Sequence, residues 1–235
     1  MNNTQQSPVE KVPFEKKPTE KTKVVRGAKR ANYDPAIINA ILDSHFLCHV
    51  GFVIDGEARI IPTAYVRIDD AIYVHGNLHN QMMTALLDGQ SACISVTLVD
   101  GMVLARSAFH HSVNYRSVVI YAKGEKVEGD HKITVLDALI NHYVPGRVQH
   151  LRPYLQKELD ATLVVKLPIT EASAKMRSGP PVDADKDYEL NIWAGVLNVK
   201  TVIDAVEPCD RLSPSVAVPD HVQHFVSEHG LIDRI

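Results

Sequence analysis

The strongest constraint on the fold is a run of strand-like segments joined by very short connections in the first half of the chain. The first, at residues 46–55, ends in Asp55-Gly56, which is typical of a two-residue hairpin turn, and Asp100-Gly101 predicts a second such turn. The other segments lie at 58–69, 71–76, 92–101, 102–109 and 115–129. Strands so close in sequence pair as antiparallel neighbours, and closure into a barrel removes their unpaired edges. We therefore predict a closed or nearly closed antiparallel barrel.

Helices supplement this sheet. Asp34 and Pro35 are typical of a helix start, and apolar residues recur at helical spacing over 35–44. Further helical patterns lie at 80–89, 133–144, 153–159 and 220–229. A last strand is expected at 161–169, and residues 171–181 have the composition of a loop. The expected fold class is mainly β with an α supplement.

Composition and charge indicate the class of protein. Residues 1–26 are polar and mixed in charge, which predicts a disordered N-terminal arm, and residues 27–235 are expected to form one domain. The formal net charge of −3 offers no basic field for nucleic acid. No apolar run approaches the roughly 18 residues of a membrane span, and the N-terminus shows no signal-peptide pattern. We expect a cytoplasmic protein with no nucleic-acid or membrane partner.

Two neighbouring segments carry side chains that could bind a ligand. Thr63, Tyr65 and Arg67 share one face of a strand, and such a set can hold a phosphate and a ring edge or simply line a half-exposed sheet. His75-Gly76 ends the next strand, and Asn80-Gln81 begins the following helix. Backbone N–H groups at this turn can meet an anion, whereas Asn80 can equally act as an ordinary helix cap.

Polar and aromatic side chains gather in two later segments. Residues 106–117 include His110-His111, which could bind a metal or belong to a buried polar network. Adjacent histidines point to opposite sides of a strand and no carboxylate lies nearby in sequence, so the network is favoured. Trp193, the only tryptophan, could anchor a core or an interface, or stack on a planar cofactor.

Seven ordered segments over residues 29–200 resemble the FMN-binding family related to pyridoxamine 5′-phosphate oxidase, in particular its flavin-nucleotide-binding branch. The nitroimidazole-resistance flavoproteins are similar in their barrel. The segments are KRANYD (29–34), ILDSHFLCHVGFV (41–53), IPTAYVR (61–67), IYVHG (72–76), SVTLVDGMVLARSAFHHSVNYRSVV (95–119), SAKMRSGPP (173–181) and DYELNIWAGVL (187–197). Chance agreement of short motifs does not account for seven segments in the same order.

This resemblance implies an FMN-binding split β-barrel that works as a homodimer, with FMN at the subunit interface. It implies that the 61–67 strand lies along the flavin and that the turn at His75-Gly76 meets the phosphate or ribityl chain. His75 is the candidate catalytic residue, as a hydrogen-bond donor or proton source. The cofactor-binding residues that it implies are Pro62, Thr63, Tyr65, Arg67, His75, Gly76, Asn80, Gln81, Arg116, Ser117 and Trp193.

The chain departs from the family at several positions. Gln81 stands where relatives carry an arginine, and the loss of that cation weakens a phosphate site because charge-assisted hydrogen bonds are the stronger ones. Arg67 and Arg116 are the candidates to replace it. Asn191 and Asn198 stand where relatives have proline. The Arg-x-His and C-terminal signals of authentic pyridoxamine-phosphate oxidases are missing, so vitamin B6 synthesis is not expected.

Three functions follow as hypotheses. The first is a flavin-dependent oxidoreductase, in which FMN accepts hydride from NADH or NADPH and passes electrons to a small organic acceptor. The second is a flavin-binding or storage protein without turnover. The third is a haem-binding split-barrel protein, for which His110, His111 or His49 could supply the axial ligand.

Overall fold

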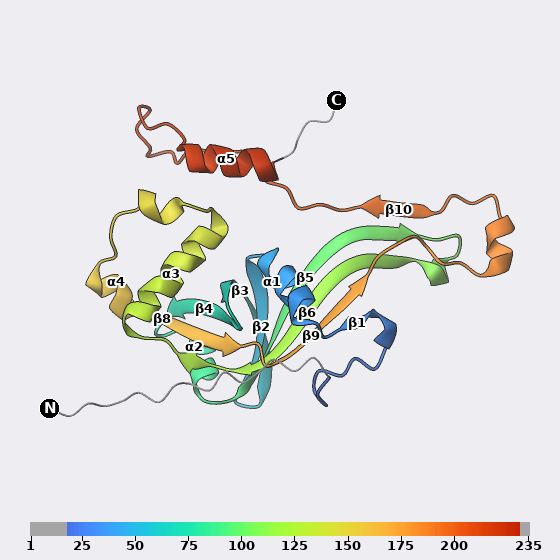
Figure 1. Cartoon of the computed structure of the whole chain (residues 1–235), viewed down its shortest axis with the longest axis horizontal. Coiled ribbons are helices and arrows are strands. Elements are labelled where there is room, and N and C mark those ends of the chain that lie inside the picture. The colour runs from blue at the N-terminus through green and yellow to red at the C-terminus, as the bar shows by residue number, and fades with distance from the viewer. Residues whose placement is uncertain (1–17, 231–235) are drawn as a thin grey trace.

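The computed structural model describes residues 18–230, and one antiparallel sheet dominates it (Figure 1). In these residues nine of its ten strands follow the order β1-β9-β6-β5-β2-β3-β4-β8-β7, and the tenth, β10, pairs with β5. The strands are β1 (Ala31–Asn32), β2 (Leu47–Ile54), β3 (Glu57–Ile68), β4 (Ala71–Asn77), β5 (Ser91–Leu104), β6 (Ser112–Lys123), β7 (Glu125–Lys126), β8 (Thr162–Pro168), β9 (Glu171–Arg177) and β10 (Gly195–Asn198). The chain runs from β6 through Gly124 into β7, so the two halves of the sheet enclose a common core. The predicted mainly β barrel is confirmed.

Five α-helices accompany the sheet in the described residues. They are α1 (Pro35–Asp43), α2 (Gln81–Leu87), α3 (Gly129–Tyr143), α4 (Gln156–Ala161) and α5 (Asp220–His229). Each corresponds to a predicted helical segment, and α1 starts as expected because the Asp34 side chain accepts a hydrogen bond from the Ala36 N–H at 3.0 Å. Within the described residues, no helix is both long and apolar enough to span a membrane.

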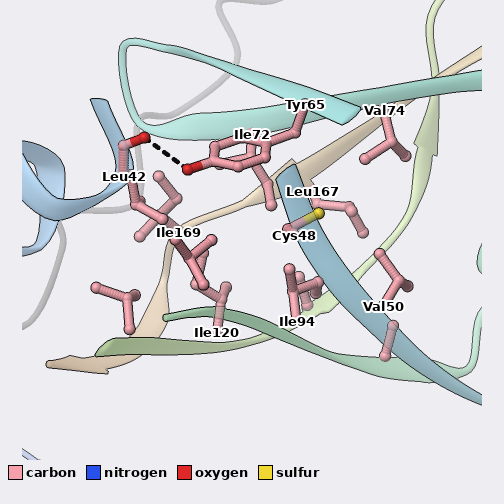
Figure 2. Packing of buried hydrophobic residues seen from close by; sticks show 14 of the residues in the cluster. Leu42, Cys48, Val50, Tyr65, Ile72, Val74, Ile94, Ile120, Leu167 and Ile169 are labelled. Carbon is pink, nitrogen blue, oxygen red and sulfur yellow. Dashed lines mark hydrogen bonds between the residues drawn. The ribbon is translucent and has the colours of Figure 1, made fainter. Parts of the chain in front are cut away.

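The main core fills the barrel, and Figure 2 shows its packing. Alternate residues of β2 and β5, such as Val50 and Ile94, point inward and meet Leu167 from β8 on the opposite side. The hydroxyl of Tyr65 donates to the Leu42 carbonyl at 2.6 Å, which ties β3 to the end of α1. The alternation of apolar residues along these strands therefore decides which side chains enter the core.

A second, smaller core lies outside the barrel, where α3 covers β4 and β8. Leu136 and Leu139 of α3 pack there with Val66, Tyr73 and Val164 from the sheet. Strands β3 and β4 are consequently buried on both faces over part of their length. This second layer decides which side chains of β4 face a helix rather than solvent.

The structure corrects the turn predicted at Asp100-Gly101. β5 continues through these residues to Leu104, with a bulge between Val99 and Gly101. A Cβ on Gly101 would lie 3.0 Å from the carbonyl oxygen of Leu197 in β10, so the glycine permits a third strand to approach. The carboxylate of Asp100 is meanwhile held across the ladder by Arg116.

Two other predictions also differ from the structure. The loop-like segment 171–181 contains β9, which pairs with β6 from Tyr121↔Glu171 to Tyr115↔Arg177, because a neighbouring strand with free backbone groups outweighs weak local propensity. The arm predicted over residues 1–26 falls partly outside the described residues. From residue 18 onward it is tied to the domain: the Val24 N–H donates to the Tyr33 hydroxyl at 2.9 Å.

A long extension projects from the barrel. Figure 1 shows the ends of β5 and β6 reaching well beyond the other strands, with β10 alongside. The segment leading to β10 exposes several large apolar side chains. They are Val182, Tyr188, Leu190, Ile192 and Trp193. Their exposure shows that this extension has an apolar surface uncovered in a single chain.

Candidate cofactor-binding site

Thr63, Tyr65 and Arg67 share one face of β3, as predicted, and that face points towards the barrel. Tyr65 is completely buried, and burial raises the pKa of its hydroxyl. Arg67 is held by a bidentate interaction with Asp43, with Nη2 2.6 Å from Oδ2. A flavin-flanking role for the Tyr65 phenol does not fit this position, because the phenol is part of the core.

The opposite face of β3 is open. Ile60 is 70% exposed and Pro62 is exposed as well, and they pair with Gly51 and His49 of β2. The same surface continues onto β5, where Ser95 pairs with His49. Of the predicted cofactor residues, Pro62 therefore lies on an open sheet surface that a planar group could contact.

The turn after β4 is shaped by packing. Asn80 caps α2 through a hydrogen bond from the Met82 N–H to its side-chain oxygen at 2.9 Å, which confirms the ordinary capping role. A Cβ on Gly76 would lie 2.9 Å from Cγ of Met83, so the glycine leaves room for this buried side chain of α2 against β4. Both residues shape the turn that the resemblance places at the cofactor.

A cation does stand beside Gln81, and it comes from an unexpected residue. Arg59 of β3 donates from Nη1 to Oε1 of Gln81 at 2.8 Å. The two predicted substitutes are engaged elsewhere, Arg67 by Asp43 and Arg116 by Asp100. Arg59 and Arg67 point to the same side of β3. Only the folded hairpin brings Arg59 to the start of α2, so its proximity to Gln81 could not be predicted from the sequence.

His75 faces the second core rather than the open sheet surface. It lines a cavity of about 320 Å³ with apolar residues of α3 and α4, including Leu139 and Leu159, and with Tyr143. Burial lowers the pKa of the imidazole, and its buried Nδ1 has no hydrogen-bond partner within residues 18–230. His75 lies on the same outer face of the sheet as Pro62, because Val66 of that face pairs with Tyr73, but α3 and α4 cover it there, and it is a polar contact in a largely apolar cavity.

The remaining predicted residues lie far apart in the fold. Arg116 and Ser117 are neighbours on β6, where Arg116 binds Asp100 at 2.8 Å and Ser117 donates to the Lys175 carbonyl at 3.1 Å. Trp193 is 66% exposed just before β10, on the extension. A single chain therefore does not assemble the predicted set into one pocket.

The His110-His111 segment forms a polar network at the outer end of the extension, where it connects β5 to β6. Asp183 is buried and lies 73 residues after His110 in the sequence. Its carboxylate accepts hydrogen bonds from the backbone and side chain of Arg106. Its carboxylate also lies 3.9 Å from Nδ1 of His110, and Asp187 is close by. Carboxylates distant in sequence thus do reach His110, and Arg106 balances the charge of Asp183, so these residues form a buried polar network.

Asp183 makes the stability of this region dependent on pH. Burial raises the pKa of its carboxyl, but the hydrogen bonds and charge of Arg106 lower it more, so the pKa lies below its usual value. Because the pKa is lower in the folded state, ionised Asp183 stabilises the fold at pH values above its unfolded pKa of about 4. This stability is lost as the pH falls through the pKa of the folded state. We expect Asp183→Asn to lower stability at pH 7 and to reduce the acid dependence, as measured by urea unfolding at pH 7 and pH 3. Equal acid dependence in both proteins would contradict this.

A larger cavity of about 790 Å³ lies between the barrel and α5. The loop after α1 supplies His45 and Phe46, the end of α3 supplies His142, and α5 supplies Phe225 and His229. Other lining residues include Leu98, Tyr143, Lys200, Val202 and Ile203. No histidine named in the sequence analysis lines this cavity. Its three histidines come from segments far apart in sequence, which left no local motif.

Comparison with known proteins finds a matching family profile and several similar solved structures. A sequence profile of the family described as pyridoxamine 5′-phosphate oxidase matches residues 34–176. The flavocytochrome Anf3 from Azotobacter vinelandii is 36% identical, with a TM-score of 0.84 over 90% of this chain and 98% of that chain. The FAD and haem binding protein from Mycobacterium smegmatis is 34% identical, with a TM-score of 0.80 over 83% of this chain and 96% of that chain.

A protein from Bacteroides thetaiotaomicron, described as a 5-nitroimidazole antibiotic resistance protein, shares the fold at 22% identity and a TM-score of 0.53. It covers 62% of this chain and 85% of its own. No curated protein sequence matches. The profile spans more than half of the chain, and the two nearer relatives align over most of it. This protein therefore belongs to the pyridoxamine 5′-phosphate oxidase family of split-barrel proteins.

Proposed function

We propose that this protein is a flavin-dependent oxidoreductase that also binds haem and works as a homodimer. The observation that carries this proposal is the 36% identity, over 90% of the chain, to a protein described as a flavocytochrome. The second relative, at 34% identity, is described as binding FAD and haem. Two redox cofactors in one small domain serve electron transfer between a donor and an acceptor.

The chain's own residues fit a flavin on the open face of β3. The ring system would lie against Ile60 and Pro62, and the phosphate end would extend past the end of this face to Arg59, whose side chain leaves the other face of β3 and reaches Gln81. Arg59 supplies the positive charge that a phosphate requires at the place where Gln81 has none. The sequence resemblance predicts FMN, whereas the name of the second relative indicates FAD, and we expect FAD.

Removing Arg59 tests this placement. We expect Arg59→Ala to weaken flavin binding at least tenfold, because the loss of one charge-assisted hydrogen bond to phosphate costs about 1.5–3 kcal/mol. The measurement is fluorescence quenching of added FAD and FMN by the flavin-free protein. Arg152→Ala is the matched control, since Arg152 pairs with Glu158 on the surface near α4. Equal flavin affinities in the two variants would show that the phosphate does not bind at Arg59.

The proposed dimer accounts for two features of the single chain. The open face of β3 and the apolar extension both expose large side chains, with Ile60 70% and Trp193 66% exposed. Exposed apolar clusters of this kind mark association surfaces. A second copy related by twofold symmetry would cover both, and it would bring distant cofactor residues together.

The cavity beside His75 suits the acceptor. It is apolar apart from His75, the hydroxyl groups of Tyr143, Tyr154 and Thr162, and the Glu158 carboxylate, which is paired with Arg152. A small uncharged organic molecule could bind there and hydrogen-bond to the imidazole. His75 is the residue we propose for contact with this acceptor.

The first experiment is the visible spectrum of the purified protein, followed by identification of the nucleotide that heat releases. Flavin bands together with a haem Soret band support the proposal, and a protein that takes up neither cofactor contradicts it. Reduction of the bound flavin by NADH, NADPH or a one-electron donor separates an oxidoreductase from the second candidate, a flavin-storage protein. A flavin that no donor reduces would favour storage.

A further inference from the structure

The cavity beneath α5 has three features that a haem pocket requires. It is large, with a volume of about 790 Å³, and its walls carry aromatic and aliphatic groups from Phe46, Leu98 and Phe225. It contains imidazoles, which are common axial ligands of haem iron. It also contains Lys200, whose ammonium group could pair with a haem propionate.

Resting on the proposed function, we infer that this cavity is the haem site and that His45 and His229 are the axial ligands. The two residues come from different elements: His45 follows α1 on the barrel, and His229 lies in the last turn of α5. Figure 1 shows α5 as a separate layer away from the barrel strands. A haem between them would join the C-terminal helix to the barrel.

His45 is prepared to act as a ligand. It lines the cavity beside Phe46, and the centroids of the two rings lie 5.3 Å apart. The side chain of His45 makes no hydrogen bond to the described residues, while its backbone carbonyl accepts from Nε2 of His142 at 3.0 Å. His142 therefore acts as a positioning residue.

The ring of His229 is oriented by a hydrogen bond, as is usual for a histidine that binds a metal. Its Nδ1 lies 2.9 Å from the Phe225 carbonyl, which makes Nδ1–H the donor and leaves Nε2 free to coordinate. Ligating histidines usually donate their other ring N–H to such a carbonyl, because this fixes the tautomer and the ring direction. Phe225 also packs on the ring of His229, with centroids 4.4 Å apart.

Two contacts hold α5 in its place above the cavity. The Ile203 N–H donates to the His229 carbonyl at 3.0 Å, and the rings of His150 and His221 stack with centroids 4.1 Å apart. The first contact uses the backbone of His229 and the second lies outside the proposed ligand set, so neither depends on a ligand imidazole. The helix can therefore keep its position when a ligand histidine is replaced.

The test is haem titration of the full-length protein and of His45→Ala and His229→Ala. It is followed by the Soret band and by electron paramagnetic resonance of the ferric form. We expect the wild type to be low-spin and each variant to bind at least tenfold more weakly or to become high-spin. Free imidazole should restore the low-spin spectrum, a rescue that a purely structural defect would not show. His111→Ala is the matched control and should behave as wild type.

The experiment distinguishes failure of the proposed haem binding from failure of the ligand assignment. A wild type that binds no haem would overturn the haem part of the proposed function, and this inference with it. A wild type that binds haem while both variants keep its affinity and its low-spin spectrum would overturn only the ligand assignment. A change confined to His111→Ala would also overturn it and would place the iron at the extension. Flavin content, measured in each variant, verifies that the barrel is folded.

Discussion

Trp193→Asp is expected to convert the proposed dimer into a monomer and to lower its flavin content. Trp193 is 66% exposed on the extension, beside Leu190 and Ile192, which are each 48% exposed. Its ring rests close to the backbone, since a Cβ on Gly195 would lie 2.9 Å from it. An interface tryptophan commonly contributes about 2–4 kcal/mol, so dissociation should become roughly 30- to 1000-fold easier. Light scattering over a concentration series measures this change.

The control for this substitution is Val25→Asp. Val25 is 83% exposed but precedes β1, away from the extension, so the same new charge should leave the mass of the assembly unchanged. A Trp193→Asp protein that stays dimeric would show that the extension is outside the interface. A wild type that is monomeric at micromolar concentration would refute the dimer itself.

Gly124→Ala is expected to destabilise the barrel by about 3 kcal/mol, through overpacking and a weakened hydrogen bond. Gly124 connects β6 to β7, and its N–H donates to the Leu86 carbonyl of α2 at 3.2 Å. An added Cβ would lie 2.5 Å from that carbonyl oxygen and 2.8 Å from Cγ1 of Val165. Backbone atoms cannot yield as a flexible side chain can, so the strands must move apart where the barrel closes.

Thermal unfolding of the cofactor-free protein measures the effect, which should be a decrease of roughly 6–12 °C in Tm for a chain of this size. Gly89→Ala is the comparison, because Gly89 has a positive φ of 77° but nothing within 4 Å of the added Cβ. Its cost should be only about 1 kcal/mol, from backbone strain. If the two substitutions lower Tm equally, steric closure at Gly124 is not the cause.

The helices and the first hairpin could be predicted from the sequence because their causes are local. The Asp34 cap, the apolar repeat of α1 and the Asp55-Gly56 turn each depend on residues close together in the chain. Asp55 and Gly56 both have positive φ, as a primed hairpin turn requires. The same local rule was wrong at Asp100-Gly101, where β10 and Arg116 hold the dipeptide inside a long strand.

The candidate site was less predictable because its groups meet only after folding. Period two correctly placed Tyr65 and Arg67 on one face of β3, but only the closed barrel shows that this face is the inner one. Arg59 reaches Gln81 across 22 residues of sequence. His45 and His229 line one cavity although 184 positions separate them. No local pattern records such pairs.

The sequence by itself therefore determined the fold class, the approximate positions of the helices and the family, because propensity, periodicity and motif order are properties of neighbouring residues. The tertiary structure alone decided which face of β3 is open, which arginine stands by Gln81 and where a large cavity lined by histidines lies. The physical reason is that burial and charge pairing arise between strands and helices. Their partners are chosen by the closure of the barrel and not by the chain on either side of a residue.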